Sequence, residues 1–210
     1  MLPVFALALA ILTAGLALVR PRLIMSGGGK AFGFVALFVF PLLASSAAGK
    51  AHLERSKSTS FCLSCHVMEQ YGRSLHIDDL DHVPAKHFQN NRVPRESACY
   101  SCHTTYTMYG NLSAKLRGLK HLYVQYLGKI PDRVALYTPY NNRECLHCHA
   151  SARGFEETSA HHEETTTMDR IRRNQLSCLS AGCHAKAHDV TALDKLKTWA
   201  QAAPQAQGAR

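Results

Sequence analysis

Two long apolar stretches stand at the start of the chain, and most of the remainder is polar. Residues 1–19 and residues 31–49 contain no charged side chain. Each is close to the roughly 20 residues that an α-helix needs to cross the hydrocarbon core of a bilayer. The segment between them is basic and carries Arg20, Arg22 and Lys30. The pattern predicts a membrane anchor over residues 1–49, made of two helices joined by a basic loop.

From residue 50 to residue 189 the chain is polar and has few apolar runs, so it cannot fill a conventional core by itself. One amphipathic helix is predicted at 111–128, with Gly128 as its stop. Its apolar residues at helical spacing are Leu112, Leu116, Leu119, Tyr123 and Tyr126. The last segment, 190–210, predicts a brief helix followed by a partly disordered, Ala/Gln-rich end.

Eight cysteines form four pairs, and a histidine directly follows each pair. Three pairs have the spacing C-x-x-C-H, and the fourth, in CLSAGCH, has the wider spacing C-x4-C-H. The residues are Cys62/Cys65/His66, Cys99/Cys102/His103, Cys145/Cys148/His149 and Cys178/Cys183/His184. C-x-x-C-H is the attachment site of c-type haem. The pattern predicts a cytochrome c with four haem c groups.

Two other uses of paired cysteines explain less of the pattern. In a disulfide framework the four adjacent histidines would be coincidences. Zinc sites of the C-x2-C type need a second pair for each metal and usually have histidine at a different spacing. Covalent haem accounts for all eight cysteines and four of the 13 histidines at once.

Haem attachment also bears on which side of the membrane the chain lies. Basic loops stay cytoplasmic, so the segment after about residue 50 is predicted to lie on the periplasmic side of a bacterial inner membrane, where c-type haem is attached. A cleaved signal peptide is the alternative, because LASSAAG offers a cleavage site near Ala47 and cleavage would leave a soluble periplasmic carrier. Two apolar stretches, with no basic residue before the first, favour a retained anchor.

The formal charge of +9 does not by itself indicate a nucleic-acid partner. Four haems would add about eight negative charges through their propionates. We therefore interpret the basic residues as charge compensation together with a membrane-facing surface, and predict no nucleic-acid binding. The basic helix at 111–128 suits either the bilayer surface or packing against haem faces.

Axial ligands are the next requirement of the haems. A low-potential six-coordinate haem needs a second ligand from outside its own motif. Nine histidines remain for this role: His52, His76, His82, His87, His121, His147, His161, His162 and His188. Four haems need at most four of them, so the residues permit bis-histidine ligation and leave the pairing open. The first motif also offers a methionine, Met68, two residues after His66.

Several local features together resemble one family of cytochromes. They are FCLSCHVM after an apolar segment, KHFQNNRVPRESACYSCH around the second motif, Lys115 twelve residues after His103, and CHAKAH at the end of the fourth motif. Over residues 32–189 the chain resembles the NapC/NirT family of membrane-anchored tetrahaem cytochromes c. The resemblance implies a mainly α fold with extensive loops, in which short helices pack around four covalent haems.

The resemblance also implies roles for particular residues. In this family the methionine of the first motif, here Met68, binds the first haem iron in preference to the motif histidine, here His66. His87 and His188 match distal ligands, and one of His161 or His162 is expected to serve as a further distal ligand. Methionine ligation raises the haem potential, which suits a haem that accepts electrons from a mild donor. The alternative is that Met68 is an ordinary apolar residue beside a haem bound by His66.

The implied activity is oxidation of a membrane quinol, menaquinol or ubiquinol. Lys115 would bind the quinol oxygen and His121 would accept protons, while the electrons pass to a periplasmic reductase or cytochrome. One departure from the family bears on this activity: the acidic residue expected after the quinol lysine is missing, and His121 and Leu122 occupy that region. The two apolar segments of the anchor and the wide C-x4-C-H spacing of the fourth motif are further departures, which leave electron transfer intact. One rival is an electron-transfer subunit of a larger membrane redox complex that never contacts quinol. The other is a multihaem reductase with an open iron.

Overall fold

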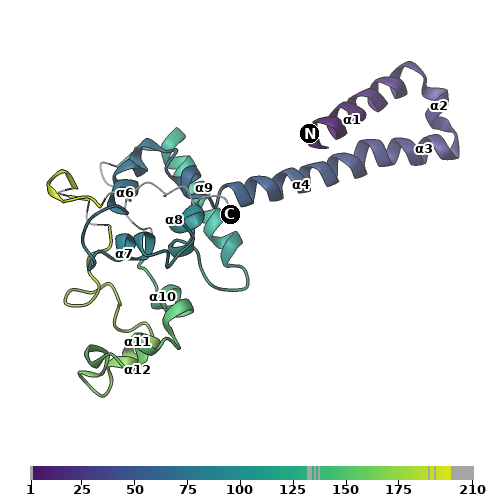
Figure 1. Cartoon of the computed structure of the whole chain (residues 1–210). Helices are drawn as coiled ribbons and strands as arrows, with labels where there is room; N and C mark the ends of the chain where they lie inside the picture. Colours follow the sequence, from purple (N-terminus) through teal and green to yellow (C-terminus); the bar gives the residue numbers. More distant parts are fainter. Residues whose placement is uncertain are drawn as a thin grey trace, which may run out of the picture. The chain divides into compact units, whose positions relative to one another are not determined.

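The computed structural model describes residues 2–131, 134, 136, 138–188, 190–191 and 193–199. The chain divides into two compact units, Met1–Ser56 and Lys57–Arg210, and each is described by itself (Figure 1). Within the described residues both units are built from helices and loops, with no β-strand; the pairing of Ile77 with Thr198 is an isolated antiparallel bridge. The prediction of a mainly α fold with extensive loops is confirmed.

The first unit is a helical hairpin. Its elements are α1 (Leu2–Val19), α2 (Pro21–Met25), α3 (Gly27–Phe34), the π-helix η1 (Val35–Val39) and α4 (Phe40–Arg55). Figure 1 shows α1 folded back alongside η1 and α4. The buried positions carry small side chains, among them Ala6, Thr13, Ala36 and Ala44. Small residues let helices approach closely where both are surrounded by apolar material, which is the packing mode of membrane helices.

One continuous helix of this unit, Gly27–Arg55, is long and apolar enough to cross a membrane. At 1.5 Å per residue it is about 44 Å long, longer than the roughly 30 Å hydrocarbon core. It extends past residue 49, where the sequence pattern had ended the anchor. The apolar helix before it, Val4–Val19, is shorter. Inside the long helix, the N–H of Phe40 donates to the carbonyl of Val35, five residues back, whereas an α-helical bond would go four residues back. Pro41 follows directly and has no N–H to donate.

The second unit consists of short helices, with α9 as the long exception among the described residues. The elements are α5 (Thr59–Cys62), η2 (His66–Met68), α6 (Glu69–Ser74), α7 (Val83–Gln89), η3 (Arg95–Ser97), α8 (Ala98–Cys102), α9 (Gly110–Leu127), α10 (Asn142–His149), α11 (Arg153–Glu156), η4 (Ser159–His162), α12 (Thr167–Arg172) and η5 (Leu193–Lys195). The amphipathic helix predicted at 111–128 is confirmed to within one residue at each end. At its start, a side chain on Gly110 would collide with the carbonyl oxygen of Thr105.

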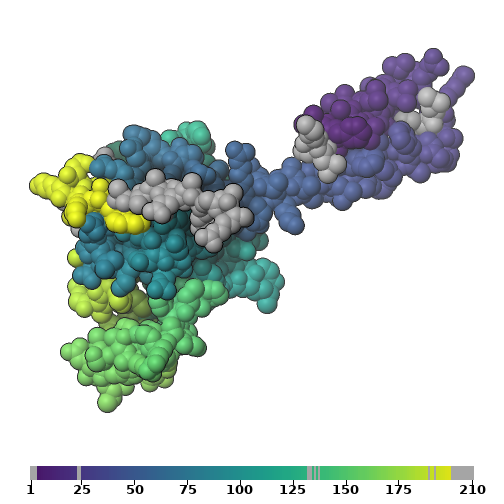
Figure 2. All heavy atoms as spheres, viewed as in Figure 1, coloured from purple at the N-terminus to yellow at the C-terminus, as the bar shows by residue number. Residues whose placement is uncertain are grey.

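Two small apolar clusters provide the core of this unit. One joins Ile77, Ala85 and Leu193, and the other joins Phe155, Met168 and Ile171. The second cluster underlies the lobe of green spheres at the bottom of Figure 2. Clusters of this size bury little apolar surface for a chain of this length, which agrees with a fold that relies on bound groups for the rest of its core.

The end of the described chain returns to the segment after α6. The N–H of Trp199 donates to the carbonyl of His76 at 2.7 Å, and the N–H of Asp78 donates to Lys197 at 2.8 Å. These bonds hold the segment after the fourth motif against the chain that follows the first. The predicted brief helix corresponds to the single turn η5, and the predicted disordered end, residues 200–210, lies outside the described residues.

Candidate haem-binding sites

None of the eight motif cysteines forms a disulfide, and several thiols of successive motifs lie next to each other. A hydrogen bond between the thiols of Cys62 and Cys99 raises the pKa of the first and lowers that of the second to about 7. The thiols of Cys145 and Cys178 interact in the same way. The first and second motifs are therefore neighbours, and so are the third and fourth.

The second and third motifs are also neighbours, which completes a series in chain order. Partial burial and the nearby thiol of Cys148 raise the pKa of Cys102. The hydroxyl of Tyr140 donates to the carbonyl of Cys102 at 2.5 Å. The ring of Tyr106 stacks on that of His147 with centroids 3.7 Å apart. Each motif thus lies beside the next one along the chain.

Two predicted attachment residues, Cys65 and Cys183, differ from this arrangement. Each is the second cysteine of its motif, and each is exposed, as Cys148 is in the third motif. Within the described part of the chain, the contacts that join neighbouring motifs involve neither thiol. Protein side chains therefore do not enclose Cys65 or Cys183 as they do Cys62 and Cys99. A thioether to haem would be covered by the porphyrin itself, so covalent attachment at these two cysteines stays a prediction from their spacing.

A tight turn before Cys183 gives the wider fourth motif the same closing hydrogen bond, from histidine to first cysteine, as the second motif. The N–H of Cys183 donates to the carbonyl of Ser180 at 3.0 Å, and the hydroxyl of Ser180 approaches the Cys183 sulfur at 3.5 Å. Gly182, directly before it, has a positive φ of 85°, which favours glycine. In the second motif the N–H of His103 donates to Cys99 at 2.9 Å, and His184 donates to Cys178 at the same distance. The turn thus absorbs the two extra residues of C-x4-C-H.

Two polar side chains fasten the motifs in pairs. The hydroxyl of Thr59 donates to the carbonyl of Arg95 at 2.7 Å and accepts the N–H of Ala98 at 2.9 Å, joining α5 to the start of α8. Asn142, which is 1% exposed, joins α10 to the fourth motif. Its amide donates to the carbonyls of Ile171 at 2.8 Å and Leu176 at 2.6 Å, and its oxygen accepts the N–H of Cys178 at 2.9 Å.

Three motif histidines each face a second histidine at a similar distance. The ring centroids are 6.1 Å apart for His103 and His188, 6.0 Å for His149 and His87, and 6.4 Å for His184 and His161. An imidazole nitrogen binds a transition metal at about 2 Å, so two imidazoles on opposite sides of one iron have centroids about 6 Å apart. These three pairs have the spacing that a bis-histidine haem requires.

The partner histidines of the three pairs use the same nitrogen, Nδ1, for a hydrogen bond. In His87 the Nδ1 lies 2.8 Å from the carbonyl oxygen of Val83, and in His161 it lies 2.9 Å from that of Phe155. A carbonyl accepts, so Nδ1 carries the proton and Nε2 keeps its lone pair. A metal-binding histidine usually donates its other N–H in this way, which fixes the tautomer and the direction of the ring.

The third partner, His188, follows the same rule through a side chain. Its Nδ1 lies 2.7 Å from Oγ of Ser74, whose own hydroxyl proton goes to the carbonyl of Tyr71, so Ser74 accepts from Nδ1. Burial lowers the pKa of His188 to about 4, which keeps the ring in the neutral form that binds metals. His188 also has a positive φ of 53°, an uncommon conformation for a residue with a side chain.

The same geometry separates His161 from His162, which the sequence had left as alternatives. In His162 it is Nε2, the nitrogen that would bind iron, that lies 2.5 Å from the carbonyl oxygen of Glu156. The hydrogen bond of His161 instead uses Nδ1, and its ring faces His184. His161 is therefore the one of the two that uses Nδ1 for its hydrogen bond and has its ring beside that of His184.

The first motif differs from the other three. The side chain of His66 is 98% exposed, and its Nδ1 pairs with the carboxylate of Glu69 at 3.3 Å. Within the part of the chain that the structure describes, no aromatic or imidazole ring is in contact with His66. Met68, at the end of the same turn, is half-buried. The arrangement is compatible with the family-derived expectation that Met68 binds iron and His66 does not.

Basic and aromatic side chains gather beside the first motif. The ammonium of Lys115 lies 4.6 Å from the centre of the Tyr100 ring, and that of Lys57 lies 5.7 Å from it. The hydrogen bond to Cys99 and burial raise the pKa of the Cys62 thiol, and the positive charge of Lys115 is close enough to oppose that rise. The hydroxyl of Tyr100 donates to Asn111 at 2.6 Å. Lys115 thus lies near the first haem-attachment site.

His121, the other residue predicted at the quinol site, lies elsewhere on α9. It is close enough to His103, in the second motif, to lower the pKa of that ring, although burial of His103 is the larger cause. Six residues separate Lys115 from His121, which is about one and two-thirds helical turns. The two side chains therefore point in different directions, and a proton acceptor at Lys115 would have to be another group or water.

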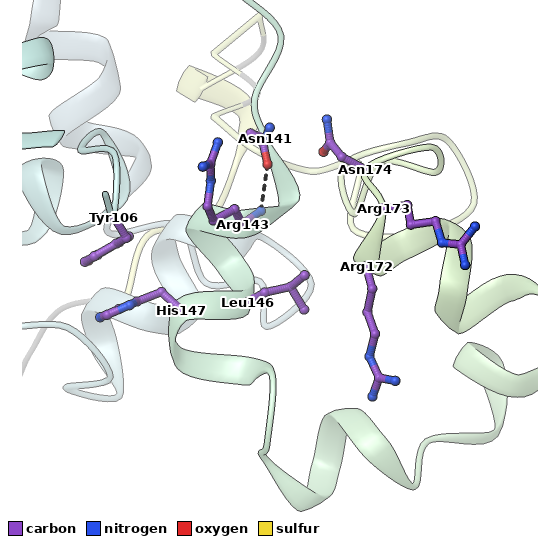
Figure 3. A pocket seen from close by; sticks show the side chains of 8 residues that line it. All are labelled: Tyr106, Asn141, Arg143, Leu146, His147, Arg172, Arg173 and Asn174. Carbon is purple, nitrogen blue, oxygen red and sulfur yellow. Dashed lines mark hydrogen bonds between the residues drawn. The ribbon is translucent and has the colours of Figure 1, made fainter. Parts of the chain in front are cut away.

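A basic cavity of about 440 Å³ lies beside the third motif. Figure 3 shows its lining residues: Tyr106, Asn141, Arg143, Leu146, His147, Arg172, Arg173 and Asn174. Arg172 donates to both carboxylate oxygens of Glu156, at 2.9 and 2.7 Å. The guanidinium groups suit carboxylates such as haem propionates. Leu146 and His147 of its lining lie between the two cysteines of the third motif, so the cavity adjoins that attachment site.

Other roles for the cysteines find little support in the described part of the chain. No three side chains of His, Cys, Asp or Glu converge there in the manner of a zinc site. The sequence reasoning also missed several residues that position the sites. Tyr100 lies between two cysteines in CYSCH and could have been noticed from the sequence. Ser74, Thr59 and Asn142 act across long separations in the chain, and no local pattern marks them.

Comparisons with known proteins identify a family for this chain. The sequence description of the NapC/NirT cytochrome c family, N-terminal region, matches residues 28–138. The cytochrome c-type protein NapC of Haemophilus influenzae is 22% identical over 173 residues, covering 74% of this chain and 73% of that protein. No solved structure gives a significant match.

Proposed function

The chain belongs to the NapC/NirT cytochrome c family, and we propose that it takes electrons from a membrane quinol and relays them through four haems to a periplasmic redox partner. Membership makes it a membrane-anchored c-type cytochrome that works in electron transfer and carries covalently bound haem c. The observation that carries the finer proposal is the series of neighbouring motifs, with a distinct first motif beside Lys115. Each part of the proposal has its own support.

Four motifs support four haems, one on each cysteine pair, with the exposed Cys65 and Cys183 as second attachment points of the first and fourth. Bound haem supplies reversible one-electron redox chemistry, and the protein controls ligands, spacing and exposure. The contacts between successive motifs run in chain order, through Cys62 and Cys99, Cys102 and Cys148, and Cys145 and Cys178. A relay from the first motif to the fourth would therefore need no long step between motifs that are not adjacent.

The axial ligands that we propose follow the ring geometry. His103 pairs with His188, His149 with His87, and His184 with His161, because each pair has the required spacing and a partner whose Nε2 is free. For the first motif we propose Met68 in preference to His66. The sulfur ligand would give that iron a higher potential than a bis-histidine ligand set gives, which favours acceptance of electrons from quinol.

Lys115 is the residue that we propose for quinol binding. Its ammonium can donate a hydrogen bond to the quinol oxygen and favour the negative charge that develops when a proton leaves. Tyr100 and Lys57 add a phenol and a second positive charge beside it. His121, near the second motif, could pass on protons only through an intervening group or water. We retain it as a second, more distant component of the site.

The proposed orientation follows from the basic loop. Arg20, Arg22 and Lys30 would keep the connection between α1 and the long helix on the cytoplasmic side. The second unit, which begins at Lys57, would then be periplasmic, where a reductase or another cytochrome can accept electrons. Retention of both apolar helices belongs to the same proposal, and the close packing of α1 on α4 through small residues supports it.

Anaerobic stopped-flow reduction tests this function directly. The full-length protein in nanodiscs is mixed with menaquinol or ubiquinol analogues, and haem reduction is followed by absorbance. We expect fast reduction in wild type, and slowing by at least about tenfold in Lys115→Ala because the hydrogen-bond donor and positive charge beside the quinol oxygen are lost. Arg117→Ala, an exposed cation on another side of the same helix, is the matched control and should reduce at the wild-type rate.

Reduction by dithionite separates the possible outcomes. If dithionite reduces every haem while neither quinol does, the chain is a relay fed by another subunit of a membrane complex. If quinol reduces the protein but Lys115→Ala and Arg117→Ala behave alike, quinol is oxidised at a site other than Lys115. Turnover of a small oxidised substrate at an open iron would instead favour the multihaem reductase.

A further inference from the structure

The helix α9 has its apolar face turned away from the protein. Six large apolar or aromatic residues recur along it, mostly at intervals of three and four: Leu112, Leu116, Leu119, Tyr123, Tyr126 and Leu127. Each is between 56% and 78% exposed. At 1.5 Å per residue the helix is about 27 Å long. The stripe is therefore a long, continuous apolar surface, which a soluble helix would normally bury.

Near its start, α9 packs on the protein through small residues on the side opposite the stripe. Gly110 is buried, and Ala114, one turn further on, is half-buried. Small side chains let the helix backbone lie close to whatever it covers. At the start of α9, the side that contacts the rest of the unit is therefore not the stripe.

The composition around the stripe indicates what covers it. The helix contains Lys115, Arg117 and Lys120 and no acidic residue. Tyr123 and Tyr126 have the amphipathic rings that collect at the level of lipid headgroups. Exposed apolar residues continue beyond both ends of the helix, at residue 108, a methionine that is 88% exposed, and at residue 130, an isoleucine. A basic, tyrosine-bearing helix with a broad apolar face is the composition of helices that lie in the bilayer interface.

We propose that α9 lies in the interface of an anionic bilayer, with its apolar stripe among the acyl chains near the headgroups. The chain is membrane-anchored by family, and only residues 56–58 separate the end of α4 from the start of α5. The bilayer is therefore within reach of the second unit. Lys115 and Lys120 flank the stripe, and positive charge beside an apolar face is attracted to anionic headgroups. This inference rests on membrane anchoring and does not require that the chain oxidise quinol.

A pair of introduced cysteines on α9 tests the inference in the full-length holoprotein. Leu119→Cys lies in the stripe, and Arg117→Cys is the matched control on another side of the helix. Both are reconstituted in nanodiscs of anionic phospholipid, checked for unchanged haem content, and exposed to a charged, water-soluble maleimide. We expect the Leu119→Cys thiol to react at least about tenfold more slowly than the Arg117→Cys thiol, because acyl chains exclude a charged reagent.

A photoactivatable phospholipid in the same nanodiscs identifies what covers the stripe. We expect lipid adducts on the peptide that spans residues 110–128 in the wild-type protein, which needs no substitution and so does not depend on how the variants fold. Equal maleimide rates at the two positions would overturn the inference. Protection of Leu119→Cys with cross-links to protein and none to lipid would also overturn it, because a second copy or a partner subunit would then cover the stripe.

Discussion

The first haem-attachment motif and the later three have the same cysteine–histidine chemistry but different surroundings. In the later three, the motif histidine faces a second imidazole with centroids 6.0 to 6.4 Å apart. In the first, the side chain of His66 is 98% exposed and pairs with Glu69. The C-x-x-C-H pattern therefore identifies where haem is attached and does not identify what binds its iron.

The difference has a functional meaning under the proposed mechanism. Three similar bis-histidine sites suit a relay, because similar ligands allow similar potentials along the series. A first site with a methionine ligand and nearby lysine is suited to accept electrons from a different kind of donor. The following substitutions are chosen to remove this difference or to measure it.

The largest effect is expected from loss of a distal histidine. His188→Leu removes the partner of His103, so the haem of the second motif should change from low spin to high spin and the relay should stop there. Electron paramagnetic resonance and absorbance of the oxidised protein report the change. His162→Leu is the matched control and should leave every spectrum unchanged, because the Nε2 of His162 already interacts with the carbonyl of Glu156.

The His188→Leu variant also tests whether a neighbouring histidine, His82, can bind the iron in its place. His82 is 2% exposed and its ring centroid lies 6.5 Å from that of His188. A low-spin spectrum that persists in His188→Leu and disappears when His82 is removed as well would mean that His82 replaces the lost ligand. Persistence in both variants would contradict the proposed pairing at the second motif.

The next largest effect is expected at the first motif itself. Met68→His would replace a sulfur ligand by imidazole and make the first site resemble the other three. Axial ligands set haem potentials over a range of about 0.8 V, and we expect the reduction potential of that haem to fall by a fraction of this range. Reduction of the haem by quinol should then slow. Redox titration followed by absorbance measures the potential. His66→Leu should leave it unchanged; a change to high spin in His66→Leu would instead identify His66 as the ligand.

The sequence predicted the attachment motifs and the long helix because these depend on local patterns. Cysteine spacing is a matter of a few residues, and the apolar repeat that marked 111–128 corresponds to α9, Gly110–Leu127. Spacing alone did not indicate that Cys65 and Cys183 would be exposed while the first cysteine of each motif is half-buried. The choice between His161 and His162 was also out of reach, because it depends on which ring nitrogen reaches a carbonyl.

The residues that orient the sites were also beyond the sequence pattern. Ser74 fixes the tautomer of His188 across 114 positions of the chain. Asn142 resembles an ordinary helix-start residue, yet its side chain bonds three backbone groups of a distant segment. The apolar repeat of α9 left open whether its stripe packs against haem faces or lies on the bilayer surface, and in the structure the stripe is exposed.

A smaller effect concerns how the motifs are fastened in pairs. Asn142→Leu leaves two carbonyls and one N–H without their partner in the pair formed by the third and fourth motifs. We expect a loss of about 3 kcal/mol in the free energy of unfolding of that lobe. Thr59→Val, in the pair formed by the first and second motifs, removes two bonds at a half-buried position and should cost about 1 kcal/mol. Denaturant midpoints of the holoprotein, followed by haem absorbance, compare the two; equal losses would mean that the pairs are fastened alike.

The smallest effect is expected from the contact between the exposed His66 and Glu69. Glu69→Gln removes the carboxylate 3.3 Å from Nδ1 of His66, and both side chains are well exposed. Exposed pairs contribute little because water screens them, so neither the thermal midpoint nor the spectrum of the first haem should change measurably. Differential scanning calorimetry and redox titration test this. A shift in the potential of the first haem alone would show that His66 is coupled to the iron, and it would make the first motif resemble the other three.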